Sequence, residues 1–240
     1  MQETLANIVY RNDHSVATAA LHVEVIGDLV CPFTFLGLKR LDKALDAVRG
    51  PVDGGWYPWQ LNPELPAEGI EFSDYLSRRF GSPSTVQPVL ESLTTEGKGD
   101  GIDFRFDRIR RMPNTLNAHQ LLYLAEIDGK DSVALAAALQ SAFFEEGRDI
   151  GDLDVLTQVA TTHGIDAASV AAINEDDKAR KAVIAREHQV RSSGVSSVPG
   201  FLLNRRLLVT GAQDVDTLVN AFDQAMFGEG TDGIESPALN

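Results

Sequence analysis

An alternation of apolar and polar residues opens the regular part of the chain. In LHVEVI, which starts at Leu21, every second residue is apolar, and this predicts a strand with one buried face. The spacing then lengthens to that of an amphipathic helix closed by Gly50-Pro51, with one apolar stripe: Leu38, Leu41, Leu45 and Val48. Residues 52–61 predict a broken strand or an edge strand, because Pro58 offers no N–H to a neighbour. The order β-α-β favours parallel strands joined by a right-handed crossover.

From residue 63 to residue 194 the pattern is helical. Asn114 is a candidate N-cap for a helix that ends at Ile127, and Gly164 and Gly194 follow two further helices as C′ glycines do. The helices predicted here span residues 72–80, 86–93 with an end near Gly97, 114–127, 133–144, 153–163 and 176–191.

Strand character returns near the end of the chain. Residues 201–203 and 207–210 predict two strands around a turn at Asn204-Arg205, and a last helix is predicted over 214–227. Two distant segments that complete one sheet around a block of helices are typical of an α/β thioredoxin fold interrupted by a helical insertion. We divide the chain into a flexible arm (1–20), a thioredoxin-like domain (21–62 and 195–227), a helical insertion domain (63–194) and a flexible tail (228–240).

The charge balance limits the kinds of partner. The 240 residues include 21 Lys and Arg against 35 Asp and Glu, for a formal net charge of -14. Such acidity argues against a nucleic acid and against an anionic membrane surface, because both are bound through basic residues. We therefore expect a small molecule or another protein as the partner. No apolar run approaches the length of a membrane span.

The chain has a single cysteine, which cannot form an internal disulfide. Residues 1–20 lack the positive start and continuous apolar core of a secretory signal. Both observations predict a protein of the reducing cytoplasm. One cysteine cannot build an all-cysteine metal cage, and no two histidines have metal-ligand spacing, so we expect neither a metal nor a tightly bound cofactor.

Cys31 lies where the strand pattern gives way to the helix, in VCPFT. A thiol there meets unpaired N–H groups and the positive end of the helix dipole, which favours the thiolate and predicts a lowered thiol pKa. Pro32 suits the first helical position, because its missing N–H would have no partner there. The Thr34 hydroxyl could donate to the sulfur or cap the helix. The alternative, a buried structural cysteine, stays open.

A second feature is the Val198-Pro199 pair just before a predicted strand. Proline is tolerated at the first residue of a strand. A cis bond at this point would expose the Val198 backbone for pairing with an extended ligand. An ordinary trans proline in a loop is the alternative.

Several segments, taken in chain order, resemble the DsbA family of thioredoxin-fold oxidoreductases, especially its FrnE-like branch. They are DLVCPFTFLG from Asp28, WYPWQLNP from Trp56, MPNTLNAH from Met112, FFEEGRDI from Phe143, GVSSVPGF from Gly194 and TGAQ from Thr210. The resemblance covers nearly all of residues 21–227. It implies that Cys31 is the N-terminal active-site thiol and that a cis Pro199 faces it.

Thr34 departs from the pattern of this family. The resemblance implies Cys-Pro-x-Cys, whereas here threonine fills the second position and no other cysteine exists. A dithiol cycle needs a second thiol in the same site. The chemistry implied for this chain is therefore monothiol, with glutathione or another external thiol resolving the mixed disulfide. The partner would be a small thiol, or a small-molecule or protein disulfide.

The chain is also similar to the kappa-class glutathione transferases and 2-hydroxychromene-2-carboxylate isomerases, which share this fold. In them a serine at the position of Cys31 supports a bound glutathione thiolate. This resemblance implies that Val198 holds the cysteinyl backbone, that Gln213 and Asp214 meet the γ-glutamyl group, and that Asn62 contributes. It is also compatible with a homodimer.

Four further residues complete the predicted binding site. Pro32 and Phe33 adjoin Cys31, and Asn114 and His119 lie in PNTLNAH. His119 could line the cleft beneath the thiol, or it could equally be hydrogen-bonded between the two domains.

Three classes of function remain open at this stage. The first is a glutathione-linked monothiol oxidoreductase, with Cys31 as the nucleophile beside Thr34 and Pro199 as the substrate clamp. The second is a glutathione-dependent isomerase or transferase acting on a small aromatic substrate. The third is a non-catalytic binding module that kept the fold.

Overall fold

The computed structural model describes residues 21–228, and they begin with the predicted strand, helix and strand. These elements are β1 (Leu21–Gly27), α1 (Pro32–Leu45) and β2 (Val52–Pro58). β2 pairs with β1 in parallel, from Leu21 opposite Val52 to Gly27 opposite Pro58, and forms the edge of its sheet. Both predictions, parallel pairing and an edge position, are confirmed.

Two more strands and a last helix complete this unit: β5 (Gly200–Leu203), β6 (Leu207–Thr210) and α9 (Val215–Phe227). The sheet order is β2-β1-β5-β6, and β5 runs antiparallel to both of its neighbours. Asn204 and Arg205 turn the chain between β5 and β6 with φ of 47° and 53°. The thioredoxin arrangement expected from the pattern is therefore present, although its strands come from the two ends of the described chain.

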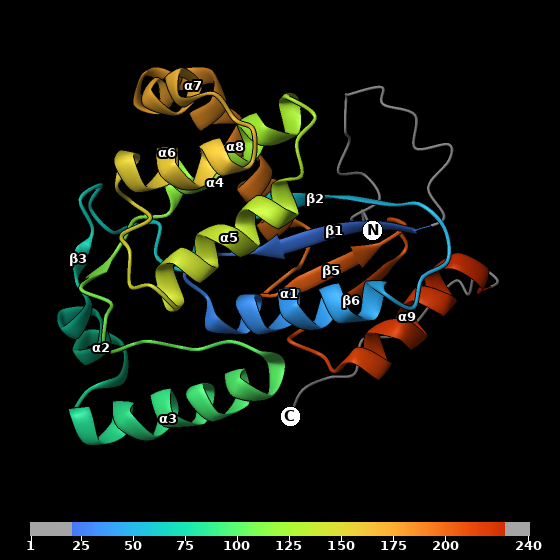
Figure 1. Ribbon diagram of the computed structural model, residues 1–240, viewed down its shortest axis with the longest axis horizontal. Helices are drawn as coiled ribbons and strands as arrows, with labels where there is room; N and C mark the ends of the chain where they lie inside the picture. The colour runs from blue at the N-terminus through green and yellow to red at the C-terminus, as the bar shows by residue number, and fades with distance from the viewer. Residues whose placement is uncertain (1–20, 229–240) are drawn as a thin grey trace.

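Apolar layers lie on both faces of this sheet. Helices α1 and α9 cover one face in Figure 1, where Val23, Val25 and Phe201 belong to the main core. Ile26 and Leu202 face the opposite way, and they pack with Val190 of the helical region in a smaller core. The alternation along β1 and β5 thus buries both faces of the sheet.

The helical region lies between β2 and β5, and it occupies the upper and left parts of Figure 1. Its elements are β3 (Ile70–Glu71), α2 (Phe72–Phe80), α3 (Pro83–Asp100), β4 (Arg111–Met112), α4 (Leu116–Ile127), α5 (Ser132–Phe144), α6 (Leu153–Thr162), α7 (Ala167–Ala171), the 3-10 turn η2 (Ile173–Glu175) and α8 (Asp177–Ser192). The periodicity did not predict α7, η2 or the short β3–β4 pair.

The helix predicted over 86–93 is longer than expected. It begins at Pro83 and continues through Gly97 to Asp100, and Gly101 ends it with φ of 83°. Gly97 does not end the helix. Its role is to make room for an aromatic ring, since a Cβ there would lie 2.5 Å from Cδ2 of Phe104. The glycine serves close packing at this point.

Asn114 is not the N-cap of α4, since that position belongs to Thr115. Asn114 lies one residue earlier, and its Oδ1 still accepts a hydrogen bond from the Leu116 N–H at 3.0 Å. Its Nδ2 donates to the Leu65 carbonyl at 2.7 Å. The side chain therefore joins the start of α4 to the loop that follows β2.

Helix α8 also contacts the loop that follows β2. The Arg191 guanidinium lies over the Trp59 ring, 4.0 Å from its centroid, and donates to the Gln60 carbonyl at 2.6 Å. The Gln60 N–H in turn donates to Glu187 at 2.8 Å. The helical region thereby fixes the segment next to Cys31.

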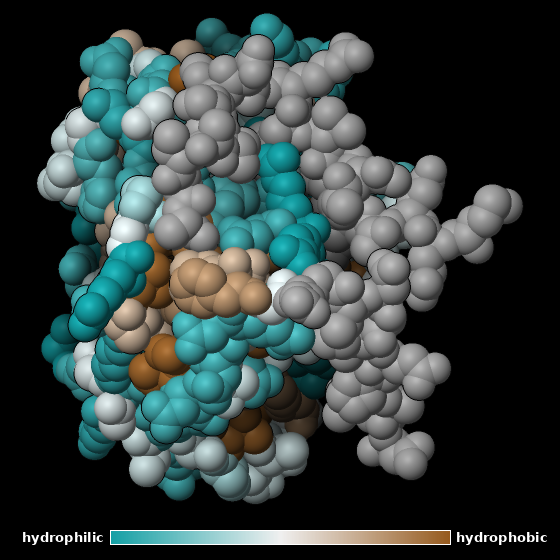
Figure 2. Space-filling model, turned by 90° about the vertical axis from the view of Figure 1, so that its right-hand side faces the viewer, coloured by the Kyte–Doolittle hydropathy of each residue, from teal (hydrophilic) through white to brown (hydrophobic). Residues whose placement is uncertain are grey.

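The described surface is largely hydrophilic. Hydrophilic side chains cover most of the described face in Figure 2, with apolar patches between them. Within residues 21–228, no helix is both long and apolar enough to cross a bilayer. The predicted arm (1–20) and the predicted tail beyond Gly228 lie outside the described residues.

Candidate active site around Cys31

Cys31 is the N-cap residue of α1, at the junction that the sequence predicts. Its backbone is extended, with φ of −92° and ψ of 113°, and Pro32 occupies the first turn. The Cys31 N–H donates to the Asp28 carbonyl at 3.2 Å, and its own carbonyl accepts from the Phe35 N–H at 3.2 Å. Only 4% of the residue is exposed. The sulfur therefore lies at the positive end of a helix but beneath the surface.

The expectation of a lowered thiol pKa is wrong for this conformation. Burial raises the pKa of Cys31, since a thiolate loses hydration there. The Thr34 side chain and the N–H groups of Thr34 and Phe33 act in the opposite direction, and the charge of Asp28 raises the pKa further. The helix start favours the thiolate as predicted, but desolvation outweighs it.

Thr34 lies fully buried behind the sulfur. Its hydroxyl does not cap α1, and Oγ1 makes no well-formed hydrogen bond within the described residues, although its proximity favours the thiolate. The predicted cap is therefore wrong, whereas the predicted action of the hydroxyl on the sulfur agrees with its lowering effect on the pKa of Cys31. The side chain packs against Gly27, where an added Cβ would meet Cγ2 of Thr34 at 2.5 Å.

The Val198-Pro199 bond is cis, as the resemblance implies. Ile26 pairs with Gly200, so Pro199 follows in register opposite Gly27, just before the Cys31 loop. Pro199 also packs on the first half of α1, because a Cβ at Gly37 would lie 3.0 Å from its Cγ.

The backbone of this loop keeps unused hydrogen-bonding groups. The Pro199 carbonyl accepts from the Gly211 N–H at 2.8 Å. By contrast, neither the N–H nor the carbonyl of Val198 is hydrogen-bonded within residues 21–228. Both groups are therefore available to an extended ligand, which matches the predicted clamp.

His119 does not line the cleft, because it lies on the face of α4 that is buried against Trp56 of β2. The Trp56 Nε1–H donates to Nδ1 of His119 at 3.1 Å, and Nε2 of His119 lies 3.2 Å from the Asp28 carboxylate. An indole N–H can only donate, so Nδ1 is the acceptor and the imidazole proton is on Nε2. Of the two interpretations left open above, the structure supports a hydrogen-bonded histidine between the domains.

Asp28 is a site residue whose role the sequence did not indicate. Its carboxylate accepts from the N–H groups of Leu29 at 2.8 Å and Leu61 at 2.7 Å, as well as from His119. An aspartate before a helix is read first as a turn residue. Two of its partners, Leu61 and His119, are 33 and 91 residues away, so only the fold reveals the network.

Asn62 and Tyr75 adjoin the site from the side of the helical region. The Asn62 amide lies against the Tyr75 hydroxyl, yet its buried Nδ2 makes no regular hydrogen bond within the described residues. Tyr75, on α2, is close enough to Cys31 and Asp28 for their charges to raise its pKa, in addition to the larger effect of burial. The sequence analysis did not single out Tyr75.

Two apolar side chains near the start of α1 are exposed. Phe33, in the first turn of α1, is 48% exposed, and Leu61, whose N–H is held by Asp28, is 41% exposed.

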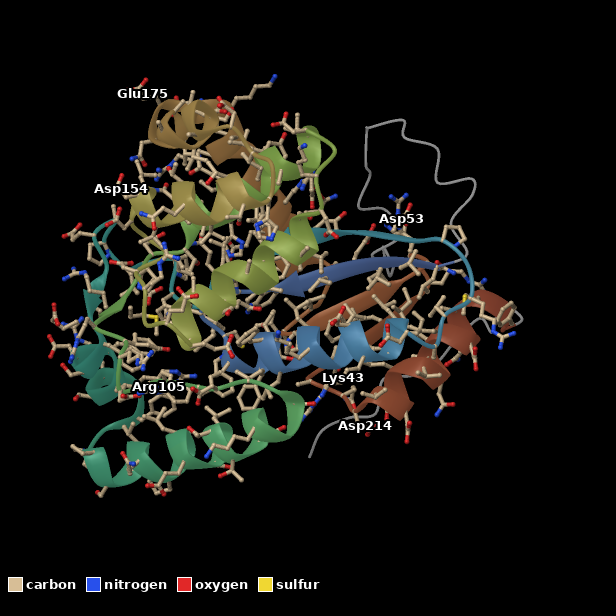
Figure 3. All side chains as sticks on the ribbon, viewed as in Figure 1. Lys43, Asp53, Arg105, Asp154, Glu175 and Asp214 are labelled. Carbon is tan, nitrogen blue, oxygen red and sulfur yellow. The ribbon has the colours of Figure 1, made fainter. Side chains whose placement is uncertain are left out.

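Gln213 and Asp214, the predicted γ-glutamyl contacts, are engaged within their own turn. Asp214 stands at the start of α9 in Figure 3, where it accepts from the Thr217 N–H at 2.7 Å, and this bond lowers its pKa. Gln213 donates to the Thr210 carbonyl at 2.8 Å. Arg40 of α1 donates to the Ala212 carbonyl at 2.6 Å and ties the loop to the active-site helix. No hydrogen bond joins Gln213 or Asp214 to Cys31 in the described part.

Within residues 21–228, no group of three or more His, Cys, Asp or Glu side chains is arranged to hold a metal ion. The Asp28 carboxylate near Cys31 is instead hydrogen-bonded to His119 and to the Leu61 N–H.

Known proteins share this fold. A crystal structure of a probable DsbA oxidoreductase from Streptomyces coelicolor superposes with a TM-score of 0.78 at 28% identity, covering 91% of this chain and all of that one (100%). An uncharacterized protein of Bacillus subtilis, YwbO, is 27% identical over 205 residues, which are 84% of this chain and 95% of that protein.

A more distant structure shares the fold alone. It is the cytosolic disulfide reductase DsbM of Pseudomonas aeruginosa with GSH, at 18% identity and a TM-score of 0.51, covering 85% of this chain and 95% of that one. The model of the DSBA-like thioredoxin domain matches residues 22–223, which include nearly all of β1, the whole helical region and most of α9. The chain therefore belongs to the DSBA-like thioredoxin-domain family.

Proposed function

We propose that this protein is a monothiol thiol–disulfide oxidoreductase of the DsbA type, with Cys31 as its nucleophile and glutathione as its partner thiol. The observation that carries the proposal is the pairing of two distant segments. Cys31 caps α1 beside a cis Pro199, and the neighbouring Val198 has free backbone groups. Thr34 occupies the place of a second thiol in the same turn.

The chemistry then follows from having one sulfur. The Cys31 thiol loses its proton, and the thiolate attacks one sulfur of a bound disulfide to form a mixed disulfide while the other sulfur leaves. Thr34 cannot resolve this species, so an external thiolate must attack it and regenerate Cys31. Such a cycle requires a reduced thiol pool, which supports our assignment to the cytoplasm.

Glutathione suits this role for two reasons. The free N–H and carbonyl of Val198 are the groups that pair with an extended peptide backbone, and glutathione supplies one at its cysteinyl residue. DsbM, a reductase with the same fold, has been crystallised with GSH. Gln213 and Asp214 would have to leave their present partners, or use their remaining polar atoms, to contact the γ-glutamyl group.

The test is the mass of the intact protein after incubation with glutathione disulfide. We expect the addition of one glutathionyl group, located on Cys31 by peptide mapping and removed by excess thiol. Cys31→Ala provides the control and should gain no mass. An unmodified wild-type protein that is folded and reduced would overturn the proposal.

One observation favours a second candidate, a glutathione-dependent isomerase or transferase. Burial raises the pKa of Cys31, and a protonated thiol can donate a hydrogen bond to a bound glutathione sulfur, as serine does in the related enzymes. The two candidates differ for Cys31→Ser. Disulfide exchange should be abolished, whereas isomerase or transferase activity on an aromatic substrate should survive.

A further inference from the structure

The hydroxyl group of Thr34 is buried without a partner in the fold. The residue is 0% exposed, and its Oγ1 makes no regular hydrogen bond within residues 21–228. A buried donor that is left unpaired costs on the order of a hydrogen bond. Valine has the same branched shape without the hydroxyl, so the presence of threonine at this buried position calls for an explanation.

The position of Thr34 on α1 places this hydroxyl near the sulfur. Cys31 is the N-cap of the helix and Thr34 is its third residue, and the Phe35 N–H closes the turn by donating to the Cys31 carbonyl at 3.2 Å. Helical side chains tilt toward the N-terminus, and residues three apart share one face. On its other side Thr34 packs on Gly27, where an added Cβ would lie 2.5 Å from Cγ2 and 3.2 Å from Oγ1. The side chain is therefore held between β1 and the turn that carries the sulfur.

The charge on the sulfur decides whether this hydroxyl has an acceptor. A neutral thiol is a weak acceptor, so the hydroxyl has little to bond while Cys31 is protonated. A thiolate carries a full charge and accepts a much stronger hydrogen bond. Burial has the largest effect on the pKa of Cys31 and raises it, and the Thr34 side chain comes first among the groups that lower it. The hydroxyl thus favours the charged form of the sulfur.

We propose that the Thr34 hydroxyl stabilises Cys31 as the leaving thiolate when an external thiol resolves the mixed disulfide. This inference rests on the proposed function and assigns a task in the resolving step to the residue that stands in place of a second thiol. A less basic leaving thiol departs faster. When Cys31 itself attacks a disulfide, part of this gain is lost, because a less basic thiolate is also a weaker nucleophile. The resolving step therefore gains most from Thr34.

The step balances in atoms and electrons. The external thiol gives its proton to water, and its thiolate attacks the R sulfur of the mixed disulfide between Cys31 and R. A bond forms between the external sulfur and the R sulfur, the bond from R to Cys31 breaks, and its electron pair leaves on the Cys31 sulfur. Thr34 donates a hydrogen bond to this thiolate. Cys31 is thereby reduced, and the external thiol is oxidised to its disulfide with R.

The release of glutathione from the loaded protein tests this assignment. Wild-type, Thr34→Val and Thr34→Ser proteins are first converted to the mixed disulfide with glutathione disulfide. They are then mixed with reduced glutathione, and the mass of the intact protein follows the release. For Thr34→Val we expect a roughly tenfold slower release, because one hydrogen bond to a charged group is lost. Thr34→Ser keeps the hydroxyl and should release glutathione at nearly the wild-type rate.

The stability of the reduced protein separates this role from a structural one. Because the hydroxyl has no partner in the fold, Thr34→Val should leave the urea midpoint unchanged or raise it, although it slows the release. The pKa of Cys31, measured by the pH dependence of its alkylation, should rise in Thr34→Val and stay near the wild-type value in Thr34→Ser. The titratable groups that act on Cys31, namely Asp28 with its partner His119, and Tyr75, are the same in all three proteins. The comparison therefore isolates the hydroxyl.

Thr157→Val is the matched control, because the Thr157 hydroxyl on α6 donates to the Leu153 carbonyl at 2.7 Å within its own helix. It should leave the release of glutathione unchanged. A release from Thr34→Val at the wild-type rate would overturn the inference, as would a slower release that Thr34→Ser shares or that comes with a loss of stability. If the wild-type protein takes up no glutathione, the proposed function fails. If it is loaded normally and Thr34→Val releases glutathione as fast, only this inference fails.

Discussion

The polar groups at the two ends of β1 differ in whether they are hydrogen-bonded. At the first end, both ring nitrogens of His22 have carboxylate partners, Glu24 and Asp53, and Glu24 also accepts from Arg205 at 3.1 Å. At the other end, around Cys31, buried polar atoms of Thr34 and Asn62 lack regular hydrogen bonds.

We relate the paired end of β1 to the stability of the fold and the end near Cys31 to function. Buried polar groups are normally paired, because an unpaired one forfeits the hydration that it had in the unfolded chain. Pairing at the His22 end follows that rule and anchors the start of the sheet beside Asp53, which Figure 3 labels at the end of the molecule far from α2. The groups left unpaired near Cys31 are those that a bound sulfur compound could satisfy.

The largest expected effect is a loss of stability after a substitution at the paired end of β1. Glu24→Ala removes a buried acceptor from both His22 and the Arg205 guanidinium, and it should lower the free energy of unfolding by about 3 kcal/mol. Urea titration measures this loss. The rate at which Cys31 forms a mixed disulfide under native conditions should change by no more than about twofold, because the substitution lies at the other end of β1. A twofold change in rate corresponds to RT ln 2, which is a small fraction of the lost free energy of unfolding.

Glu24→Gln serves as the control for shape. It keeps an acceptor oxygen and the packing of the side chain, so its loss should be clearly smaller than that of Glu24→Ala. If Cys31 reactivity fell in proportion to the lost stability, the two ends of β1 would not be independent, and the comparison would be wrong.

The next effect sharpens the account of the Cys31 end. Asp28→Asn removes a charge that raises the pKa of the Cys31 thiol, so that pKa should fall. One of the hydrogen bonds from His119, Leu29 or Leu61 would be lost or weakened, at a cost of about 1 kcal/mol. The pH dependence of Cys31 alkylation measures the pKa, and urea titration the cost. A pKa that is unchanged or higher would show that desolvation alone sets it.

The fold could be predicted largely from the sequence, because the residues within each main element carry the pattern that predicts it. The change from a two-residue to a three- or four-residue period located β1 and α1, and Asn204-Arg205 located the turn between β5 and β6. Helix α3 was underestimated because Gly97 reads as a stop signal, although in the fold it accommodates Phe104. A packing role for glycine is invisible until its neighbour is known.

Some residues of the candidate site could also be predicted from local sequence signals, whereas others could not. Cys31 and Pro199 were predictable, because a helix start and a proline before a strand carry local signals and because the ordered motifs resemble a family. The raised pKa of Cys31 depends on burial, and the contacts of Asp28 with His119 and of Asn62 with Tyr75 join segments that lie far apart in the chain. Nothing in the local pattern encodes those distances.

The smallest effect returns to the paired end of β1 and concerns pH. The pKa of His22 is raised chiefly by its hydrogen bond to Glu24, against the lowering effect of desolvation and with added help from Asp53. A raised pKa in the folded state means that the folded protein holds this proton more tightly than the unfolded chain. The resulting stabilisation is therefore complete below the unfolded value of about 6.5 and is lost as pH rises through the raised pKa of the folded state.

His22→Gln tests this argument, because glutamine keeps polar atoms near both carboxylates but carries no titratable charge. The free energy of unfolding of the wild-type protein should exceed that of His22→Gln most at acidic pH, and the gap should narrow as His22 loses its proton. Urea titrations of both proteins across this range measure the gap. A gap that widened with rising pH would mean that the folded protein favours neutral His22, and that its contacts with Glu24 and Asp53 are ordinary hydrogen bonds rather than ion pairs.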